Sequence, residues 1–216
     1  VLTWRVYAGP PPASGPGRWA WRLIPVGVAA GFGPCWWAIG IGQNTGLIAA
    51  GLAGFLYLRT RGRPGWAGVC AALTAVKPHL LALFGLALLL DAVVHSAGRR
   101  AVLAGGAVLL ALGLLALAPN PNVYADYRAA LAKPASPVLV PVAHWQVPTA
   151  GYRLRMLAVD AVGGDRQNAL FWVQFVPLAV AAAALVPYWW VRRRAWDWAV
   201  ETPRLALASG LVAPYG

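Results

Sequence analysis

Acidic side chains are scarce in this 216-residue sequence, which has six Asp and Glu against 18 Lys and Arg. Cysteine is also rare, and the two cysteines, Cys35 and Cys70, both lie in apolar stretches. Two such residues exclude a disulfide framework and a cysteine-based metal site, so we interpret them as packing residues. The sequence has no GxSxG motif, no Walker phosphate loop and no paired carboxylates. We therefore expect no bound metal and no cofactor.

The sequence is rich in apolar residues. Hydrophobic residues make up 60% of the chain, charged residues only 11%, and the mean hydropathy is +0.61. This composition predicts an all-α, polytopic membrane protein. The formal net charge is +12, but the arginines form short clusters beside apolar runs, which follows the positive-inside rule and does not indicate a nucleic-acid partner. Membrane lipid is the expected surrounding, in a multi-pass protein of the plasma or inner membrane.

The apolar runs predict one membrane-embedded domain over residues 1–216, in which each span is long enough to cross or nearly cross a bilayer. The predicted spans are at about residues 23–41, 44–58, 66–77 with 78–90, 101–118 and 169–191, with another starting at 205. The sequence begins with Val1 and ends inside an apolar run. We therefore expect both ends to be truncated, and this piece by itself to be inactive.

Residues 119–168 form the longest polar interruption and are predicted to be an outer loop. A loop of this length is usually functional or disordered. Within it, residues 122–132 place Val123, Tyr127 and Leu131 on one face of a helix, which predicts a helix lying on the membrane surface.

The organising feature is the triplet Lys77-Pro78-His79 near the middle of the apolar stretch 66–90. Proline lacks the backbone N–H and clashes with the preceding turn, so a helix kinks or ends there. A lysine at the centre of a bilayer costs about 2.5–3.5 kcal/mol on insertion scales and usually faces protein or water. The triplet predicts a broken helix that builds a site. The alternative is a simple kink, with Lys77 extending its ammonium group to a lipid headgroup.

The stretch 66–90 could cross the membrane once or bend at the triplet and return. Raw counts of Lys and Arg do not choose between the two topologies. The clusters that touch span ends, at 59–63, 99–100 and 192–194, share one side only if the chain bends. We therefore expect a bent hairpin, each arm being about 18–20 Å of helix.

The bend brings three polar features to one side. The turn at residues 42–45, the tip at Lys77-Pro78-His79 and the loop 119–168 then all face the extracytoplasmic side. We expect them to surround one cavity near that surface.

Cations dominate this expected cavity. Lys77 and His79, together with Arg153 or Arg155 from the loop, suit a phosphate whose lipid chain stays in the bilayer, such as a polyprenyl phosphate. The alternative for the two arginines is contact with lipid headgroups.

Polar and aromatic residues of the same side could bind a sugar. Gln43 and Asn44 offer the donors and acceptors that hydroxyl groups need, and Trp145 could stack on a sugar ring. The alternative for Gln43 and Asn44 is a simple polar turn flanked by glycine. Asp126 and His144 are weak candidates for a general base, with Asp160 as a further possibility.

The order of the motifs resembles the core of glycosyltransferase family 87, a GT-C group once catalogued as a domain of unknown function. The resemblance begins at G-Q-N (42–44), continues through R-G-R-P (61–64) and A-G (67–68), and reaches K-P (77–78). The segment WQVPTAGYRLR (145–155) resembles an outer-loop motif of some members, and LASGLVAPYG (207–216) resembles the start of a later helix.

The resemblance implies a GT-C-like helical bundle that transfers a hexose, often mannose, from a polyprenyl-phosphate donor to a glycan or glycolipid acceptor. Transfer would occur on the extracytoplasmic face. The family's expected catalytic aspartate would lie upstream of this sequence, so only Gln43, Lys77 and Arg155 are carried over, as substrate-binding residues. Two other classes of function stay open, a transporter or flippase of an amphipathic anion and a non-catalytic membrane scaffold.

Overall fold

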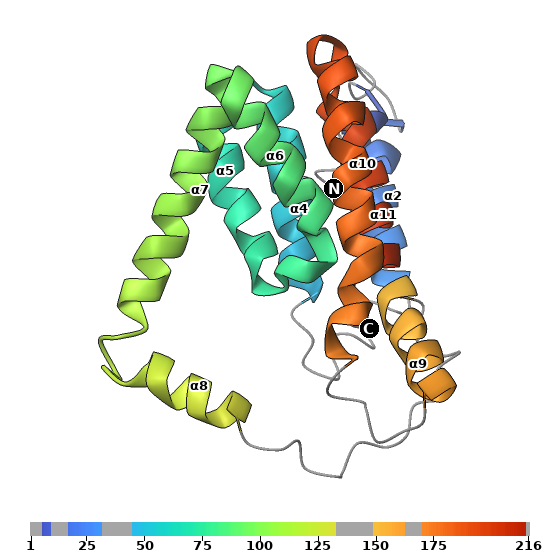
Figure 1. The fold of residues 1–216 in the computed structure, drawn as a ribbon. Helices are drawn as coiled ribbons and strands as arrows, with labels where there is room; N and C mark the ends of the chain where they lie inside the picture. The colour runs from blue at the N-terminus through green and yellow to red at the C-terminus, as the bar shows by residue number, and fades with distance from the viewer. Residues whose placement is uncertain (1–5, 10–16, 32–44, 133–148, 163–169, 215–216) are drawn as a thin grey trace.

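The computed structural model describes residues 6–9, 17–31, 45–132, 149–162 and 170–214. Every regular element within these residues is helical, which confirms the all-α class (Figure 1). The elements in chain order are α2 (Gly17–Gly31), α4 (Thr45–Thr60), α5 (Pro64–Ala72), the 3₁₀ helices η1 (Leu73–Val76) and η2 (Pro78–Leu81), α6 (Ala82–Val94), α7 (Ser96–Leu115), α8 (Val123–Ala132), α9 (Ala150–Val162), the 3₁₀ helix η5 (Phe171–Phe175), α10 (Val176–Arg192), the 3₁₀ helix η6 (Arg193–Ala195) and α11 (Trp198–Val212).

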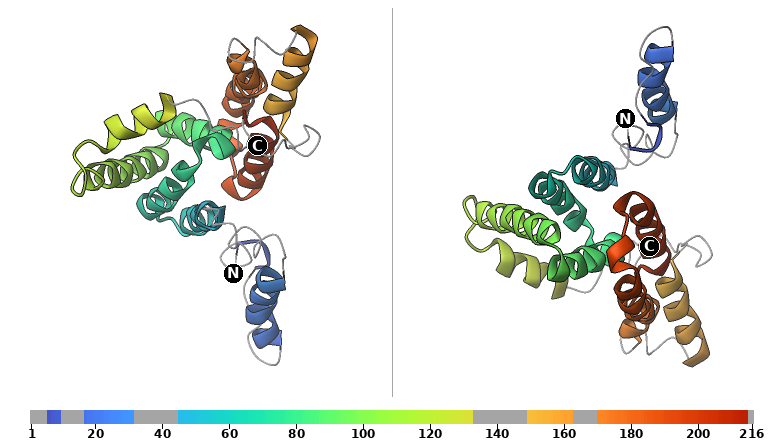
Figure 2. Two further views of the ribbon diagram at one scale, coloured as in Figure 1. Left: turned by 90° about the horizontal axis from the view of Figure 1, so that it is seen from below. Right: turned by 90° about the horizontal axis from the view of Figure 1, so that it is seen from above.

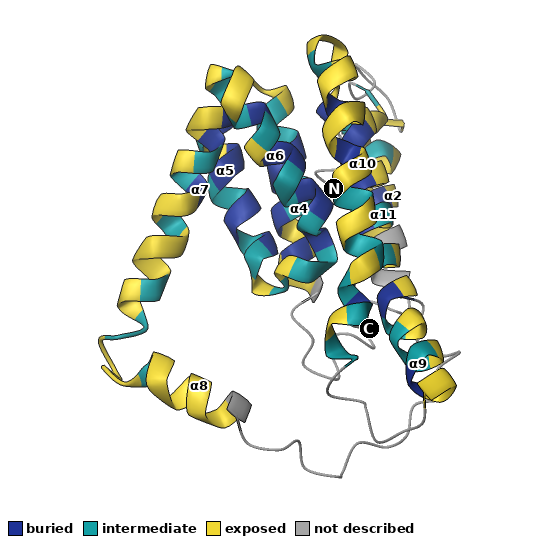
Figure 3. Cartoon of the chain, in the orientation of Figure 1, coloured by how far each residue is buried: buried dark blue, intermediate teal, exposed yellow. Residues whose placement is uncertain are grey.

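Two helices among the described residues are long and apolar enough to cross a membrane, at Ser96–Leu115 and Phe171–Ala195. Only 17% and 11% of these windows are buried, so neither is the buried core helix of a soluble protein. Exposed residues cover much of both helices (Figure 3), and they include the apolar residues Leu103 of α7 and Val180 of α10. This exposure supports association with a membrane, while the full set of predicted spans stays a prediction.

Several predicted boundaries differ from the structure. The helix expected over residues 23–41 begins earlier, at Gly17, and its description ends at Gly31. The helix expected to start at 205 begins at Trp198, because Asp197 caps it by accepting a 2.8 Å hydrogen bond from the backbone N–H of Ala199. The predicted outer loop contains a second helix, α9, besides the expected surface helix, which is α8.

The turn between α4 and α5 follows from the sequence R-G-R-P. Gly62 adopts a positive φ of 67°, which glycine allows without a steric penalty. The N–H of Arg63 donates to the carbonyl of Leu58 at 2.9 Å, and the N–H of Gly62 donates to Arg59 at 3.1 Å. These two bonds form a Schellman motif, which ends α4. Pro64 then starts α5, where a proline needs no N–H.

The chain reverses direction at Lys77. The helix α5 gives way to η1, Lys77 has φ −135° and ψ 77°, and η2 leads into α6. In Figure 1, α5 and α6 meet at the lower end of the bundle, whereas α6 and α7 join at the upper end. The two arms therefore form a helical hairpin whose tip is Lys77–Leu81.

A buried ion pair fastens the open end of this hairpin. The carboxylate of Asp91, only 2% exposed, accepts a 2.8 Å bond from Arg59 Nη2 at the end of α4. Its other oxygen lies 2.8 Å from His95 Nδ1, just before α7. Arg59 and Asp91 can meet only because the chain has returned to its starting end. The arginines of the α4–α5 turn and of the α7 start thus lie at the same end of the bundle.

The first arm of the hairpin, α5, packs against α7 and α4 through small residues. A Cβ on Gly68 of α5 would lie 1.9 Å from the carbonyl oxygen of Ala101 on α7, and one on Gly105 would lie 2.8 Å from the carbonyl oxygen of Gly68. Ala101 and Gly105 are four residues apart, as in the small-xxx-small pattern of membrane helix pairs. On the other side of α5, a Cβ on Gly54 would lie 2.7 Å from Cys70 Sγ, so Cys70 is the packing residue that we predicted.

The core joins α4, α6 and α11. Phe55, Phe84 and Trp198 meet edge to face, with ring centroids 5.0 Å, 5.0 Å and 5.9 Å apart. Such ring pairs contribute about 0.5–1.5 kcal/mol each beyond burial. Near the other end of α11, the backbone N–H of Leu83 donates to the hydroxyl of Ser209 at 3.1 Å. This bond satisfies an N–H in the first turn of α6, which has no partner within its own helix.

A second buried carboxylate joins α10 to α11. Glu201 is 3% exposed and accepts bonds from Tyr188 at 3.1 Å and from Arg204 at 3.2 Å, and it pairs with Arg192 at 3.3 Å. The cluster at 192–194 is therefore held where α10 ends, at the upper end in Figure 1. All three arginine clusters lie at that end.

Substituting Gly68→Ala is expected to force α5 and α7 apart, because the new methyl group would overlap the Ala101 carbonyl. Overpacking of this kind costs about 1–3 kcal/mol, measurable as a lower unfolding midpoint in detergent. Gly65→Ala on the same helix is the matched control, since its Cβ meets nothing within 4 Å. Equal midpoints for the two variants would contradict the crossing.

Candidate functional site

The tip of the hairpin presents Lys77 and His79 outside regular α-helix. Both side chains are half-buried, and the carbonyl of Lys77 accepts a 3.1 Å bond from the N–H of Leu80. Pro78 is the first residue of η2, where its fixed φ and its missing N–H are tolerated. The proline therefore does what the sequence predicts, and the break holds a lysine and a histidine together at one turn.

The helix α11 links this tip to α9. Ser209 contacts the start of α6, and a few residues later the end of α11 meets Gly151 of α9. A Cβ on Gly151 would lie 2.8 Å from the carbonyl oxygen of Ala213 and 2.9 Å from Cα of Pro214, so only glycine fits this approach. The tip and α9 thus lie toward the end of the bundle opposite the Asp91 ion pair (Figure 1).

The two arginines of α9 differ in their surroundings. Arg153 is exposed, whereas Arg155 is half-buried. The guanidinium of Arg155 donates from Nη1 to Gln174 Oε1 at 3.5 Å and lies 5.5 Å from the ring centroid of Phe171. Arg155 therefore faces the protein, and Arg153 faces the surroundings, as a headgroup contact would require.

Two buried polar residues were not among the predicted site residues: Gln174, which lies beside Arg155, and Thr149, which precedes α9. Gln174 is 1% exposed and Thr149 is 3% exposed. Among the described residues, Gln174 Nε2 and Thr149 Oγ1 find no hydrogen-bond partner. An unsatisfied buried polar group costs about 1–3 kcal/mol, so a polar ligand here would relieve a real cost. The sequence signal that could have identified Gln174 is its polar amide side chain within the uncharged stretch 169–191.

The two candidate bases that the structure describes do not gather at the tip. Asp126 is exposed on α8 and accepts a 2.9 Å bond from Asn120 Nδ2. Figures 1 and 2 show α8 beside α7, away from α9. Asp160 is exposed on α9. Neither is brought beside Lys77, and a role for either carboxylate as a base stays a prediction.

The remaining predicted residues, Gln43, Asn44, His144 and Trp145, lie outside the described residues. In the part of the chain that is described, no three His, Cys, Asp or Glu side chains are grouped so that they could hold a metal. The expectation that the protein binds no metal and no cofactor stays a prediction.

The two buried carboxylates, Asp91 and Glu201, lie at the end of the bundle opposite the hairpin tip. Asp91 and Glu201 are both neutralised by arginines from other helices or turns. Their partners are the arginine clusters, so these acids hold the fold together and are not free to act as bases. The described tip region is correspondingly cationic.

Comparison with known proteins gives one match. The sequence model described as glycosyltransferase family 87 matches residues 1–214. No curated protein and no solved structure matches the chain.

Substituting Asp91→Asn is expected to destabilise the protein strongly, because it leaves Arg59 without its buried counter-ion. Removing one partner of a buried pair typically costs about 3–5 kcal/mol. Asp126→Asn, which alters an exposed carboxylate, is the control and should change the free energy of unfolding little. Similar unfolding curves for both variants would mean that the ion pair does not hold the hairpin closed.

Proposed function

Because the chain belongs to glycosyltransferase family 87, whose members are membrane proteins, we propose that it transfers a hexose from a polyprenyl-phosphate donor. Mannose is the expected sugar, and a glycan or glycolipid is the expected acceptor. Transfer takes place on the extracytoplasmic face of the plasma or inner membrane. The protein carrying this chain crosses that membrane several times.

The observation that carries the proposal is the helix break at Lys77. A lysine and a histidine at a helical turn, reached from within apolar helices, suit a phosphate group joined to a hydrocarbon chain. A transporter of an amphipathic anion could use the same break, but family membership favours the glycosyltransferase.

The sidedness of the proposal rests on the arginine clusters. The clusters at 59–63, 99–100 and 192–194 lie at one end of the bundle, and the positive-inside rule assigns that end to the cytoplasm. The hairpin tip and α9 are toward the other end. This arrangement supports an extracytoplasmic site.

The proposed transfer reaction consists of three events. The acceptor hydroxyl attacks the anomeric carbon of the sugar, the bond from that carbon to the phosphate oxygen breaks, and the lipid phosphate leaves with its electrons. In this proposal Lys77 and His79 stabilise the charge that develops on the departing phosphate, which is greater in the transition state than in the donor. Arg155, which lies against Gln174 and Phe171, and the exposed Arg153 are further predicted contacts of the substrate.

Sugar recognition falls to polar groups near α9. Gln174 and Thr149 offer a donor and a hydroxyl without partners among the described residues, and sugar hydroxyls are suitable partners for both. Gln43, Asn44 and Trp145 remain predicted contributors. The base that accepts the proton of the acceptor hydroxyl is expected to be a carboxylate outside the described residues.

Substituting Lys77→Ala in the complete protein is expected to raise the KM for the lipid-phosphate donor about tenfold or more, the loss of one charged hydrogen bond. Lys77→Arg should recover part of the activity, since it keeps the charge. Arg128→Ala, which removes an exposed charge on α8, is the control. Unchanged sugar transfer by Lys77→Ala would remove this lysine from the site.

Sidedness can be tested on either side of α7, at its first residue and on α8, the helix that follows it. Single cysteines at Ser96 and Ala129, both exposed, are introduced after Cys35 and Cys70 are replaced by alanine. A membrane-impermeant maleimide should label Ala129→Cys in intact cells, and Ser96→Cys only after permeabilisation. The reverse pattern would place the hairpin tip in the cytoplasm, and equal labelling would mean that α7 does not cross the membrane.

A further inference from the structure

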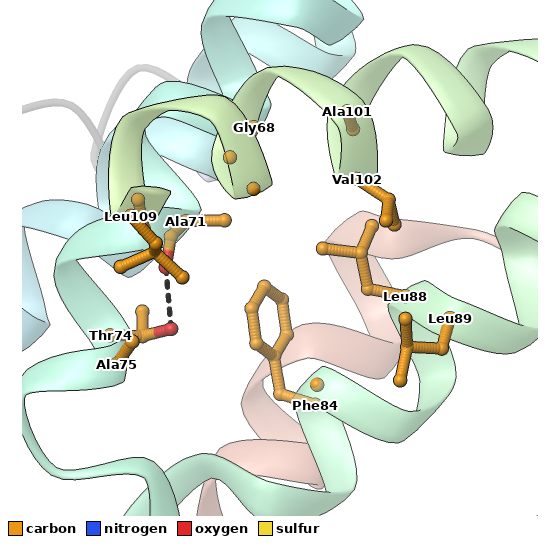
Figure 4. A pocket seen from close by; sticks show the side chains of 14 residues that line it. Gly68, Ala71, Thr74, Ala75, Phe84, Leu88, Leu89, Ala101, Val102 and Leu109 are labelled. Carbon is orange, nitrogen blue, oxygen red and sulfur yellow. Dashed lines mark hydrogen bonds between the residues drawn. The ribbon is translucent and has the colours of Figure 1, made fainter. Parts of the chain in front are cut away.

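An apolar cavity of about 260 Å³ lies between the two arms of the hairpin and α7 (Figure 4). Small residues form much of its wall, including Ala71, Ala75 and Ala101, and larger side chains such as Phe84, Leu88 and Leu109 complete it. The cavity is open on one side, where Leu89 and Leu109 are exposed. Apolar surface that is hollowed in this way favours an apolar occupant.

The chemistry of the wall excludes a sugar or phosphate as that occupant. Thr74 is the polar side chain among the residues that line the cavity, and its hydroxyl already donates to the carbonyl of Ala71 at 2.6 Å (Figure 4). A polar ligand would lose its hydrogen bonds to water here without gaining others. A hydrocarbon chain would lose nothing and would fill the space.

The glycines of the wall fall into two groups. Gly68 and Gly105 are required by the close crossing of α5 and α7, where a Cβ would meet backbone atoms within 3 Å. Gly85 of α6 and Gly106 of α7 are different, because a Cβ at either position meets nothing within 4 Å. Glycine inside a helix costs up to about 1 kcal/mol relative to alanine. Helix packing does not require these two glycines, and their effect is to keep the cavity open.

The cavity opens sideways at the outer surface. Leu89 and Leu109 line it and are 56% and 43% exposed, and Gly106 is also exposed. The neighbouring surface of α7 carries the exposed leucines Leu103 and Leu110. An apolar chain could thus enter directly from the bilayer without crossing a polar barrier.

One end of the cavity leads toward the hairpin tip. Thr74 and Ala75 line that end, and Lys77 follows two residues later along the chain. An amphipathic molecule with its phosphate at the tip would therefore have its hydrocarbon chain alongside this cavity. The cavity and the cationic turn complement the two halves of one lipid phosphate.

We propose that the cavity between α5, α6 and α7 binds the hydrocarbon chain of the lipid-phosphate donor, next to its phosphate. This inference rests on the proposed function and adds to it the place of the chain and the residues that select for it. Gly85 and Gly106 determine how wide a chain the cavity accepts.

The test fills the cavity from within and compares two donors. Gly85→Leu and Gly106→Leu are prepared in the complete protein, with Gly210→Leu on α11 as the matched control, because Gly210 also has open space but does not line the cavity. Transfer is measured with a long polyprenyl-phosphate sugar and with a donor whose lipid is cut to two isoprene units.

Both filled variants should raise the KM for the long-chain donor about tenfold, as expected when roughly two methylene groups lose their burial. The KM for the short donor should change much less, and Gly210→Leu should behave as wild type with both. A series of Ala, Val and Leu at residue 85 should raise the long-chain KM stepwise, which keeps the test informative if a leucine prevents folding.

The outcomes separate the two proposals. If the wild-type protein transfers sugar and the filled variants match Gly210→Leu, the cavity does not hold the chain and the proposed function survives. A wild-type protein that transfers no sugar from either donor overturns the proposed function.

In that case a long-chain polyprenyl phosphate with a photoactivatable group still tests the cavity, because cross-linking to α6 or α7 should disappear in Gly85→Leu. Persistent cross-linking would overturn the cavity assignment by itself.

Discussion

The salt bridge between Arg59 and Asp91 is the constraint on which the arrangement of this bundle depends. It joins the end of α4 to the end of α6, and His95 adds the start of α7 to the same carboxylate. Once these three chain segments are tied at one point, the stretch between them must travel away and return. The position of Lys77 at the far end of the hairpin is a consequence of that tie. An ion pair at one end of the molecule thereby sets the place of a cationic turn at the other.

The distribution of the few acidic residues has a simple physical logic. A buried carboxylate is tolerated only with a counter-ion, and the arginines that follow the positive-inside rule provide one. Asp91 and Glu201 both use arginines of those clusters, so the arginines on which the proposed orientation rests also stabilise the fold. The tip region holds Lys77 and His79 at the opposite end of the bundle from these two ion pairs. Ion pairs thus stabilise the fold at one end of the bundle, and the proposed phosphate-binding residues lie at the other end.

Much of this could be predicted from the sequence because the signals are local. Proline after Lys77 breaks the helix, and Gly62 followed by Arg63 and Pro64 ends one helix and starts the next. The features that escaped prediction depend on distant contacts. Glu201 and Arg204 made residues 198–204 unlike a span, yet Glu201 pairs there with Arg192 of α10 and with Arg204 itself. The helix α9 is fixed by Gly151 against the end of α11, and the role of Gln174 emerges only when Arg155 lies beside it.

The bond between Leu83 and Ser209 has a consequence for how the protein is made. The two residues are separated by 126 positions, so the ribosome completes the hairpin long before it synthesises its partner. Until α11 arrives, an N–H in the first turn of α6 has no hydroxyl to accept its hydrogen bond, in surroundings where such a group is costly. The first turn of α6 therefore gains its last hydrogen-bond partner only when the chain around Ser209 has been made.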